Sequence, residues 1–407
     1  MLKLSNLFDR SEIKALDWLL LGVPIAFAVR YVPAWKDDTA LFIVSGIAIV
    51  PLAGWMGRAT EQLAARTGHG LGGLLNATFG NAAELIIALI ALSKDLTDVV
   101  KASLTGSIIG NTLLVLGGSI LAGGLKYPRQ TFGRRAAHIA STSLGLAAIG
   151  LIIPSIFHHA AARQPGGWSP QAEQNLSLAI AVVLFVTYLL WLVFMLLTHK
   201  ELFASQPAQH DSETQGDKVV WPVFTSIAVL VVSTIFVAII SEFLVSSVEP
   251  TTRRLGLTEV FVGVIIVAII GNAAEHSTAI SAALNNKMDL SLSIAIGSSL
   301  QIALFVTPVL IFASYLFKQP MSLEFTVPEV VAVALAVWIV ASVCSNGETN
   351  WLEGVQLLSV YLILGILFLF LPQGHQRETN DDRQNGQSAV HRVDSEPAAL
   401  NVPLERL

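Results

Sequence analysis

Two acidic side chains stand deep inside apolar stretches of the sequence, and each ends the same five-residue motif. The motif Gly-Asn-Ala-Ala-Glu occurs at residues 80–84 and again at 271–275, so its carboxylates are Glu84 and Glu275. A buried carboxylate is costly unless it is paired. No Lys or Arg occupies the middle of any predicted apolar stretch. The sequence therefore predicts that Glu84 and Glu275 bind a cation or protons.

An amide side chain accompanies each carboxylate. Asn81 lies three residues before Glu84, and Asn272 lies three residues before Glu275. Residues three apart share one face of a helix. Each motif is therefore predicted to present a carboxylate and an amide oxygen together.

The next apolar stretch of each half adds further oxygen donors. Ser107 is followed by Asn111 at i+4, and Ser298 by Gln301 at i+3, which places each pair on one helix face. These residues are candidate ligands, although such side chains also serve only to hydrogen-bond neighbouring membrane helices. Close approach of the helices is predicted from four nearby glycines, which are Gly80, Gly106, Gly271 and Gly297.

Four other residues are second-tier candidates. His276 follows Glu275 directly, so it points about 100° away on a helix and fits proton relay or plain packing equally well. Glu61 and Glu242 lie near the ends of apolar stretches, where a gating or proton-path role competes with simple solvation. Ser299 stands beside Ser298 and is a further candidate contact.

Two carboxylates ringed by neutral oxygens suit a hard divalent cation such as Ca²⁺, which takes about six to eight oxygen ligands. The same two carboxylates, left empty and close together, repel one another and favour protonation. A cation that displaces protons on one side of a membrane, and is displaced by them on the other, gives antiport. Charge matching predicts two or more protons for each divalent ion.

Composition places this chemistry in a membrane. The chain has 407 residues, of which 53% are apolar and only 13% charged, which excludes an ordinary water-soluble enzyme. The net charge of −5 offers no basic surface for nucleic acid, and the single cysteine, Cys344, excludes an internal disulfide and a cysteine-rich cofactor site. No cofactor is expected, since the ions are substrates.

The apolar runs are continuous rather than alternating, which predicts helices and not barrel strands. We expect an all-α, multi-pass protein of about eleven transmembrane helices in a plasma, inner or organellar membrane. The predicted spans are 16–33, 40–57, 70–93, 98–123, 136–157, 174–198, 219–245, 257–283, 289–315, 325–344 and 351–371.

The repeated motif predicts a duplication. The two copies are offset by 191 residues, and the register also aligns Gly106-Ser107 with Gly297-Ser298. Each half holds five predicted spans, an odd number, so the halves are predicted to be inverted relative to each other, as in secondary transporters. The predicted parts are an N-terminal segment (1–39), a first repeat (40–198), a hydrophilic loop (199–218), a second repeat (219–372) and a polar, disordered tail (373–407).

Lys and Arg are somewhat more abundant in the loops on the side of the N-terminus, which favours a cytoplasmic N-terminus. A cleaved signal peptide over residues 1–28 is an open alternative, because a small-residue pattern follows a basic start. The sequence leaves the oligomeric state open.

These residues resemble the cation/calcium exchanger superfamily, and specifically its Ca²⁺/H⁺ antiporter branch. The resemblance rests on residues 76–84, on Glu275-His276 within the second motif, and on the stretches 106–111 and 297–301. A Gly-Thr-Ser-x-Pro-Glu pattern typical of Na⁺/Ca²⁺ exchangers is absent. The resemblance covers about residues 40–375 and implies an eleven-helix exporter of cytosolic Ca²⁺, with Glu84 and Glu275 binding the metal ion.

Three other functions compete with this one. An antiporter of the same fold for Na⁺ or K⁺ needs fewer of the same ligands. A cation channel would show flux that does not depend on a proton gradient, and the inverted repeat argues against it. An intramembrane metalloenzyme with a His-Glu-x-x-His motif is excluded because the sequence has none.

Overall fold

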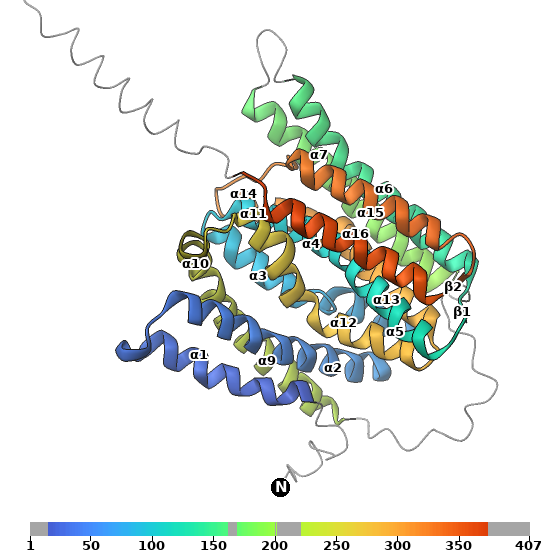
Figure 1. Ribbon diagram of the computed structural model, residues 1–407, viewed down its shortest axis with the longest axis horizontal. Coiled ribbons are helices and arrows are strands. Elements are labelled where there is room, and N and C mark those ends of the chain that lie inside the picture. The colour runs from blue at the N-terminus through green and yellow to red at the C-terminus, as the bar shows by residue number, and fades with distance from the viewer. Residues whose placement is uncertain (1–14, 162–168, 200, 202–220, 373–407) are drawn as a thin grey trace, which may run out of the picture. The chain divides into compact units, whose positions relative to one another are not determined.

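The computed structural model describes residues 15–161, 169–199, 201 and 221–372, and most of them are helical (Figure 1). The predicted tail and most of the predicted inter-repeat loop lie outside the described residues. The α-helices are α1 (Gly22–Tyr31), α2 (Asp38–Phe79), α3 (Ala82–Ser93), α4 (Thr97–Ile109), α5 (Leu116–Lys126), α6 (Arg134–Ala161), α7 (Pro170–Val193), α9 (Val223–Ser246), α10 (Val248–Leu255), α11 (Glu259–Phe261), α12 (Ala268–Leu284), α13 (Met288–Gln301), α14 (Thr307–Leu316), α15 (Val327–Val343) and α16 (Trp351–Leu369).

Several helices join end to end through short π-helical turns. These turns are η4 (Gly110–Val115) between α4 and α5, η6 (Val262–Val267) between α11 and α12, and η7 (Ile302–Val306) between α13 and α14; a fourth, η5 (Phe194–Thr198), ends α7. Two 3₁₀ turns, η2 (Ala15–Leu21) and η3 (Pro33–Trp35), flank α1. Within the described residues, the only β-strands are β1 (Gln130–Thr131) and β2 (Glu348–Thr349), which pair antiparallel.

Among the described residues, eight helical runs are long and apolar enough to cross a membrane. They are Asp38–Thr67, Thr97–Lys126, Arg134–Ala161, Pro170–Thr198, Val223–Leu255, Glu259–Leu284, Met288–Leu316 and Trp351–Leu369. The apolar helices α3 and α15 are shorter, with 12 and 17 residues, and α1 has 10. The all-α membrane fold is confirmed, and the number of eleven crossings stays a prediction.

Helix starts follow capping chemistry. Asp37 accepts a hydrogen bond from the backbone N–H of Ala40 at 2.8 Å, which begins α2. Thr326 and Glu329 form a reciprocal capping box at the start of α15, whose second residue is Pro328, in the first turn where a proline is tolerated. Polar residues just outside the apolar runs therefore set where these helices begin.

One predicted boundary is wrong. The sequence predicted a break between spans at 57 and 70, whereas α2 runs unbroken from Asp38 to Phe79, and the chain breaks at Gly80 and Asn81 before α3. Residues 58–69 contain charges that interrupt the hydropathy, yet alanine, leucine, glutamate and arginine favour helix. Consequently Arg58 lies inside a helix rather than at the end of a span.

Two of these helical runs form the centre of the molecule. The most apolar windows of Thr97–Lys126 and Met288–Leu316 are 72% buried, against 28% for Pro170–Thr198, Val223–Leu255 and Trp351–Leu369. The outer helices expose large apolar side chains such as Leu190 and Phe224, as expected for surfaces that face lipid. Helix α2 packs along α9, with α1 beside them (Figure 1). The central runs carry Ser107, Asn111, Ser298 and Gln301.

Candidate ion-binding site

Two helices bring the carboxylates together. Glu84 lies in the first turn of α3 and packs directly on α12, because a Cβ at Gly271 would stand 3.0 Å from Glu84 Cγ. Glu275 lies one turn further along α12, and the two carboxyls are close enough to repel each other electrostatically. Both oxygens of Glu84, and Oε2 of Glu275, are buried without a hydrogen-bond partner among the described residues. These unbonded oxygens point to a cation or protons as their missing partners.

The six neutral candidates form one connected hydrogen-bond network. Asn81 donates from Nδ2 to Gln301 Oε1, and its Oδ1 accepts from Ser298 Oγ at 2.9 Å. Asn111 donates from Nδ2 to Ser298 Oγ at 3.0 Å. Thus the amides of the first half are bound to the hydroxyl and the amide of the second.

The network continues through the second motif. Asn111 Nδ2 also donates to Asn272 Oδ1 at 2.9 Å. Asn272 Nδ2 donates to Ser107 Oγ at 2.9 Å and to the backbone oxygen of Ala268 at 2.8 Å. The oxygen Asn111 Oδ1 is buried without a partner among the described residues. All six predicted residues are therefore adjacent, and one amide oxygen remains available.

Close helix crossing makes this adjacency possible. A Cβ at Gly106 on α4 would come within 2.6 Å of three backbone atoms of Val264 in η6, and a Cβ at Gly263 would meet Ala102 Cβ at 2.5 Å. The two backbones therefore touch where Ser107 faces Asn272. The prediction of close approach holds at Gly106 and Gly271, whereas Gly297 has open space where a side chain would stand.

The two motifs differ in backbone conformation. Asn81 lies outside the helices, between α2 and α3, while Asn272 lies within α12. The Asn272 side chain donates a hydrogen bond to the Ala268 carbonyl, four residues earlier in the chain. The Asn81 side chain instead hydrogen-bonds Ser298 of α13. The repeat is therefore not symmetric at the site.

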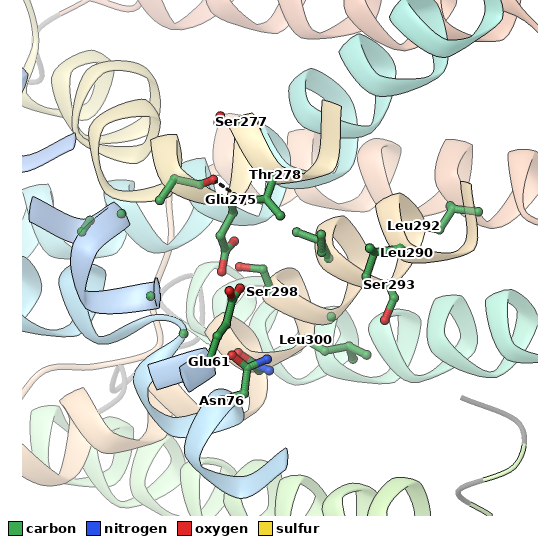
Figure 2. A pocket seen from close by; sticks show the side chains of 18 of the residues that line it. Glu61, Asn76, Glu275, Ser277, Thr278, Leu290, Leu292, Ser293, Ser298 and Leu300 are labelled. Carbon is green, nitrogen blue, oxygen red and sulfur yellow. Dashed lines mark hydrogen bonds between the residues drawn. The ribbon is translucent and has the colours of Figure 1, made fainter. Parts of the chain in front are cut away.

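A cavity of about 540 Å³ leads to this site (Figure 2). It is lined by Glu275, Ser298 and Gln301 at its inner end and extends to Gly133 and Asp289, which lie at the starts of α6 and α13. None of its described lining residues comes from the segments 94–96, 247–258 or 317–326. The cavity thus connects the site with one membrane surface, and Glu84 lies behind it.

The structure divides the second-tier candidates. Glu61 lines the cavity, and Figure 2 shows its carboxyl pointing from α2 toward that of Glu275, with Ser298 beside them. His276 is close to the site on α12, and its Nε2 is buried without a hydrogen-bond partner among the described residues.

The other two are not brought to the site. Glu242 pairs with Lys94 at 2.5 Å, is half-exposed and does not line the cavity. Ser299 is fully buried, but its hydroxyl bonds the Ala295 carbonyl of its own helix at 3.0 Å. Its neighbour Ser298 faces the network, and consecutive helical residues point about 100° apart.

Sequence reasoning missed some residues of the cavity wall. Arg58 and Asp17 form an ion pair there, at 2.6 Å, although residue 58 lies just beyond the end of the predicted span 40–57. Asn76 and Asp289 also line the wall. Asp289 had a usable signal, because it aligns with Asp98 at the offset of the repeat. Arg58 had none, since hydropathy ended the span at residue 57.

Comparison with known proteins gives the family. The family model of sodium/calcium exchanger proteins matches residues 38–197 and 225–370. The "Ca(2+)/H(+) antiporter" of Aphanothece halophytica is 46% identical, over 87% of this chain and 96% of that protein. The "Ca(2+)/H(+) antiporter ChaA" of Bacillus subtilis is 43% identical, over 86% and 97%. The solved structure of native YfkE superposes with a TM-score of 0.74 at 41% identity, covering 88% of this chain and 100% of that one. The chain therefore belongs to the sodium/calcium exchanger protein family, as its motifs predicted, and to the branch that contains the Ca²⁺/H⁺ antiporters.

Proposed function

We propose that this protein is a secondary Ca²⁺/H⁺ antiporter that exports cytosolic Ca²⁺ and works by alternating access at the site of Glu84 and Glu275. The observation that carries the proposal is the pair of neighbouring carboxylates, on α3 and α12, whose buried oxygens have no hydrogen-bond partner among the described residues, beside a network of amides and hydroxyls. Relatives named as Ca²⁺/H⁺ antiporters, at 43–46% identity over most of the chain, support it.

The donor set matches the cation. Carboxylate and amide oxygens are the ligands of hard divalent ions, and thiolates are absent from the site. Two carboxylates balance the charge of one Ca²⁺, with Asn81, Asn111, Asn272, Ser107, Ser298 and Gln301 as the neutral donors or as the frame that positions them. Ca²⁺ and H⁺ are the substrates.

Protons replace the cation on the same atoms. With no cation bound, two adjacent buried carboxylates repel each other and lose hydration, and both effects favour binding protons. Ca²⁺ and protons therefore exclude one another, which is the condition for coupled exchange. Neutralising both carboxylates requires two protons, so the minimum ratio is two H⁺ for each Ca²⁺. Glu61, which lies on the cavity wall and points at Glu275, provides a step on the route between the site and the aqueous side.

The structure supports an orientation. The cavity reaches the side of Gly133, in the loop before α6, and of Asp17 near the start of the described chain. With the N-terminus in the cytoplasm, as the charge distribution predicts, this conformation admits ions from the cytoplasmic side. Reaching the other side requires the residues between the site and the segments 94–96 and 317–326 to open.

Transport into proteoliposomes tests the function. With Ca²⁺ added outside the vesicles and an acidic interior, we expect Ca²⁺ uptake together with alkalinisation of the lumen. A protonophore that collapses the pH gradient should abolish the uptake. Alkalinisation driven by Na⁺ or K⁺ but not by Ca²⁺ would instead identify a monovalent cation/proton antiporter of the same fold. Flux that ignores the pH gradient would indicate a channel.

A further inference from the structure

One basic side chain lies on the route to the ion site. Of the charged described residues that line the cavity, Asp17, Glu61, Glu275 and Asp289 are acidic and Arg58 alone is basic. Arg58 stands on α2 three residues before Glu61, so the two side chains share a helix face. A fixed positive charge beside a cation pathway repels the entering ion, and something must compensate for it.

Two contacts hold Arg58 in place. Its Nη2 donates to Asp17 Oδ1 at 2.6 Å, and its guanidinium lies over the Trp55 ring, 4.2 Å from the ring centroid. Trp55 in turn stacks on Trp221, with ring centroids 5.9 Å apart. The side chains of Arg58 and Asp17 are only 26% and 10% exposed, so bulk water screens the pair weakly.

The compensating carboxylate comes from outside the two repeats. Asp17 lies in η2, which packs against α2 and precedes α1. Removing the charge of Asp17 would leave an uncompensated guanidinium on the cavity wall, while removing both charges would leave the wall as neutral as it is now. The Coulomb energy scales with the charge of the ion, so an unpaired Arg58 repels Ca²⁺ with twice the energy with which it repels a monovalent cation.

We propose that Asp17 neutralises Arg58 at the cavity wall and so sets the affinity for divalent cations, which makes the segment before α1 a working part of the ion pathway. This inference rests on the proposed function in assigning the cavity to Ca²⁺ entry. Asp17 is a positioning residue here: it acts on the ion through Arg58 and is not itself a ligand.

The test is a double-mutant cycle in the full chain. Asp17→Asn, Arg58→Gln and the double variant are compared with the unchanged protein in two measurements at low and high salt. The first is the Ca²⁺ concentration that gives half-maximal Ca²⁺-driven proton flux in proteoliposomes. The second is the dissociation constant for Ca²⁺ of the purified protein by isothermal titration calorimetry, which does not depend on transport. The control is Glu249→Gln, which unpairs Arg253 on α10, away from the cavity wall.

We expect Asp17→Asn to raise both constants roughly three- to tenfold, in line with one unit charge acting across a partly screened cavity. The increase should shrink at high salt, Arg58→Gln should not weaken binding, and the double variant should return to the unchanged value. Apparent affinity for Na⁺, where measurable, should change by the square root of the factor seen for Ca²⁺.

Two results would overturn the inference. One is unchanged Ca²⁺ affinity in Asp17→Asn; the other is a double variant as weak as Asp17→Asn, which would mean that Asp17 only anchors the N-terminal segment. If Asp17→Asn does not fold, Arg58→Gln decides, because weaker binding in that variant contradicts the proposal. Lack of proton flux in the unchanged protein would refute the antiport function. The Ca²⁺ dissociation constants of the four proteins, measured by calorimetry, would still test the role of Asp17.

Discussion

At the scale of single residues, two carboxylates carry the account. Glu84 and Glu275 have buried oxygens without a hydrogen-bond partner among the described residues, so replacing either carboxylate by its uncharged isostere removes both the cation's charge partner and the proton carrier. We expect Glu84→Gln and Glu275→Gln each to lower Ca²⁺/H⁺ exchange at least a hundredfold. Exchange is measured as Ca²⁺-dependent proton flux in proteoliposomes.

The matched control for this pair is Glu348→Gln, an exposed carboxylate that pairs with Arg129 away from the cavity. It should leave exchange near its original rate. Size-exclusion profiles should show all three variants folded. Normal exchange in a folded Glu84→Gln or Glu275→Gln protein would contradict the shared site.

The neighbouring serines give a second test at this scale. Ser298 Oγ joins Asn81 and Asn111, whereas the Ser299 hydroxyl is bonded within its own helix. Ser298→Ala should weaken Ca²⁺ affinity roughly tenfold by disconnecting the network. Ser299→Ala should change it less than twofold. Equal effects in calorimetric titrations would show that the hydrogen bonds do not define the site.

Much of the site was predictable at this scale for a physical reason. Buried amides and hydroxyls in apolar helices need hydrogen-bond partners. Asn81 and Asn111 were therefore expected to meet polar groups of the second half, and both hydrogen-bond such groups. Ser299 was not distinguishable from Ser298, because the sequence alone does not show which of two consecutive hydroxyls faces the neighbouring helices. The position of Arg58 on the cavity wall was not predicted, because its ion-pair partner, Asp17, is distant in sequence.

At the scale of helices, the crossing of α4 with η6 positions the site. A methyl group at Gly106 would overlap the backbone of Val264, which cannot move without separating Ser107 from Asn272. Gly106→Ala should therefore destabilise the protein by roughly 1–3 kcal/mol and weaken Ca²⁺ binding. Gly118→Ala is the control, since its methyl would meet only Ile280 Cδ1 at 3.8 Å. Equal melting temperatures for the two variants would argue against a tight crossing.

The start of α2 gives a prediction about pH. The backbone N–H of Ala40, followed by the guanidinium of Arg254, holds the pKa of Asp37 below its usual value of 3.8. A carboxyl with a lowered folded-state pKa stabilises the fold above its unfolded pKa and loses that effect as pH falls through the folded value. Asp37→Ala should thus lower the melting temperature at pH 7, and the difference should narrow below about pH 4. A difference that is constant from pH 7 to pH 3 would exclude this capping role.

The helical nature of the spans was predictable from the length of the apolar runs, but three features of the helices were not. The π-helical turns η4 and η7 begin at Gly110 and Ile302, which correspond within one residue at the repeat offset of 191, yet no hydropathy signal marks them. The unbroken helix through residues 58–69 was not predicted, because the charged residues there lower the hydropathy as a loop would. The asymmetry between Asn81 and Asn272 depends on contacts across the repeat, which identical motifs cannot reveal.

At the scale of the whole molecule, the cavity extends from the ion site toward Asp17, Gly133 and Asp289, and none of its described lining residues lies at the opposite helix ends. The free cysteine Cys344 is buried, and its replacement by alanine gives a background without thiols. In that background, Thr278→Cys on the cavity wall should react with a membrane-impermeant maleimide from the side of the N-terminus. Glu249→Cys on α10, which follows the far end of α9, should react from the opposite side. Labelling of both from one side would contradict the orientation of the cavity.

The central claim is that Ca²⁺ and protons compete for the same two carboxylates. The most direct test is simultaneous recording of radiolabelled Ca²⁺ uptake and lumenal pH in proteoliposomes with an acidic interior, which gives the number of protons leaving for each Ca²⁺ entering. We expect a ratio of two or more in the unchanged protein, and no uptake in Glu84→Gln or Glu275→Gln. A ratio of one, or Ca²⁺ uptake that persists after a protonophore has collapsed the gradient, would contradict it.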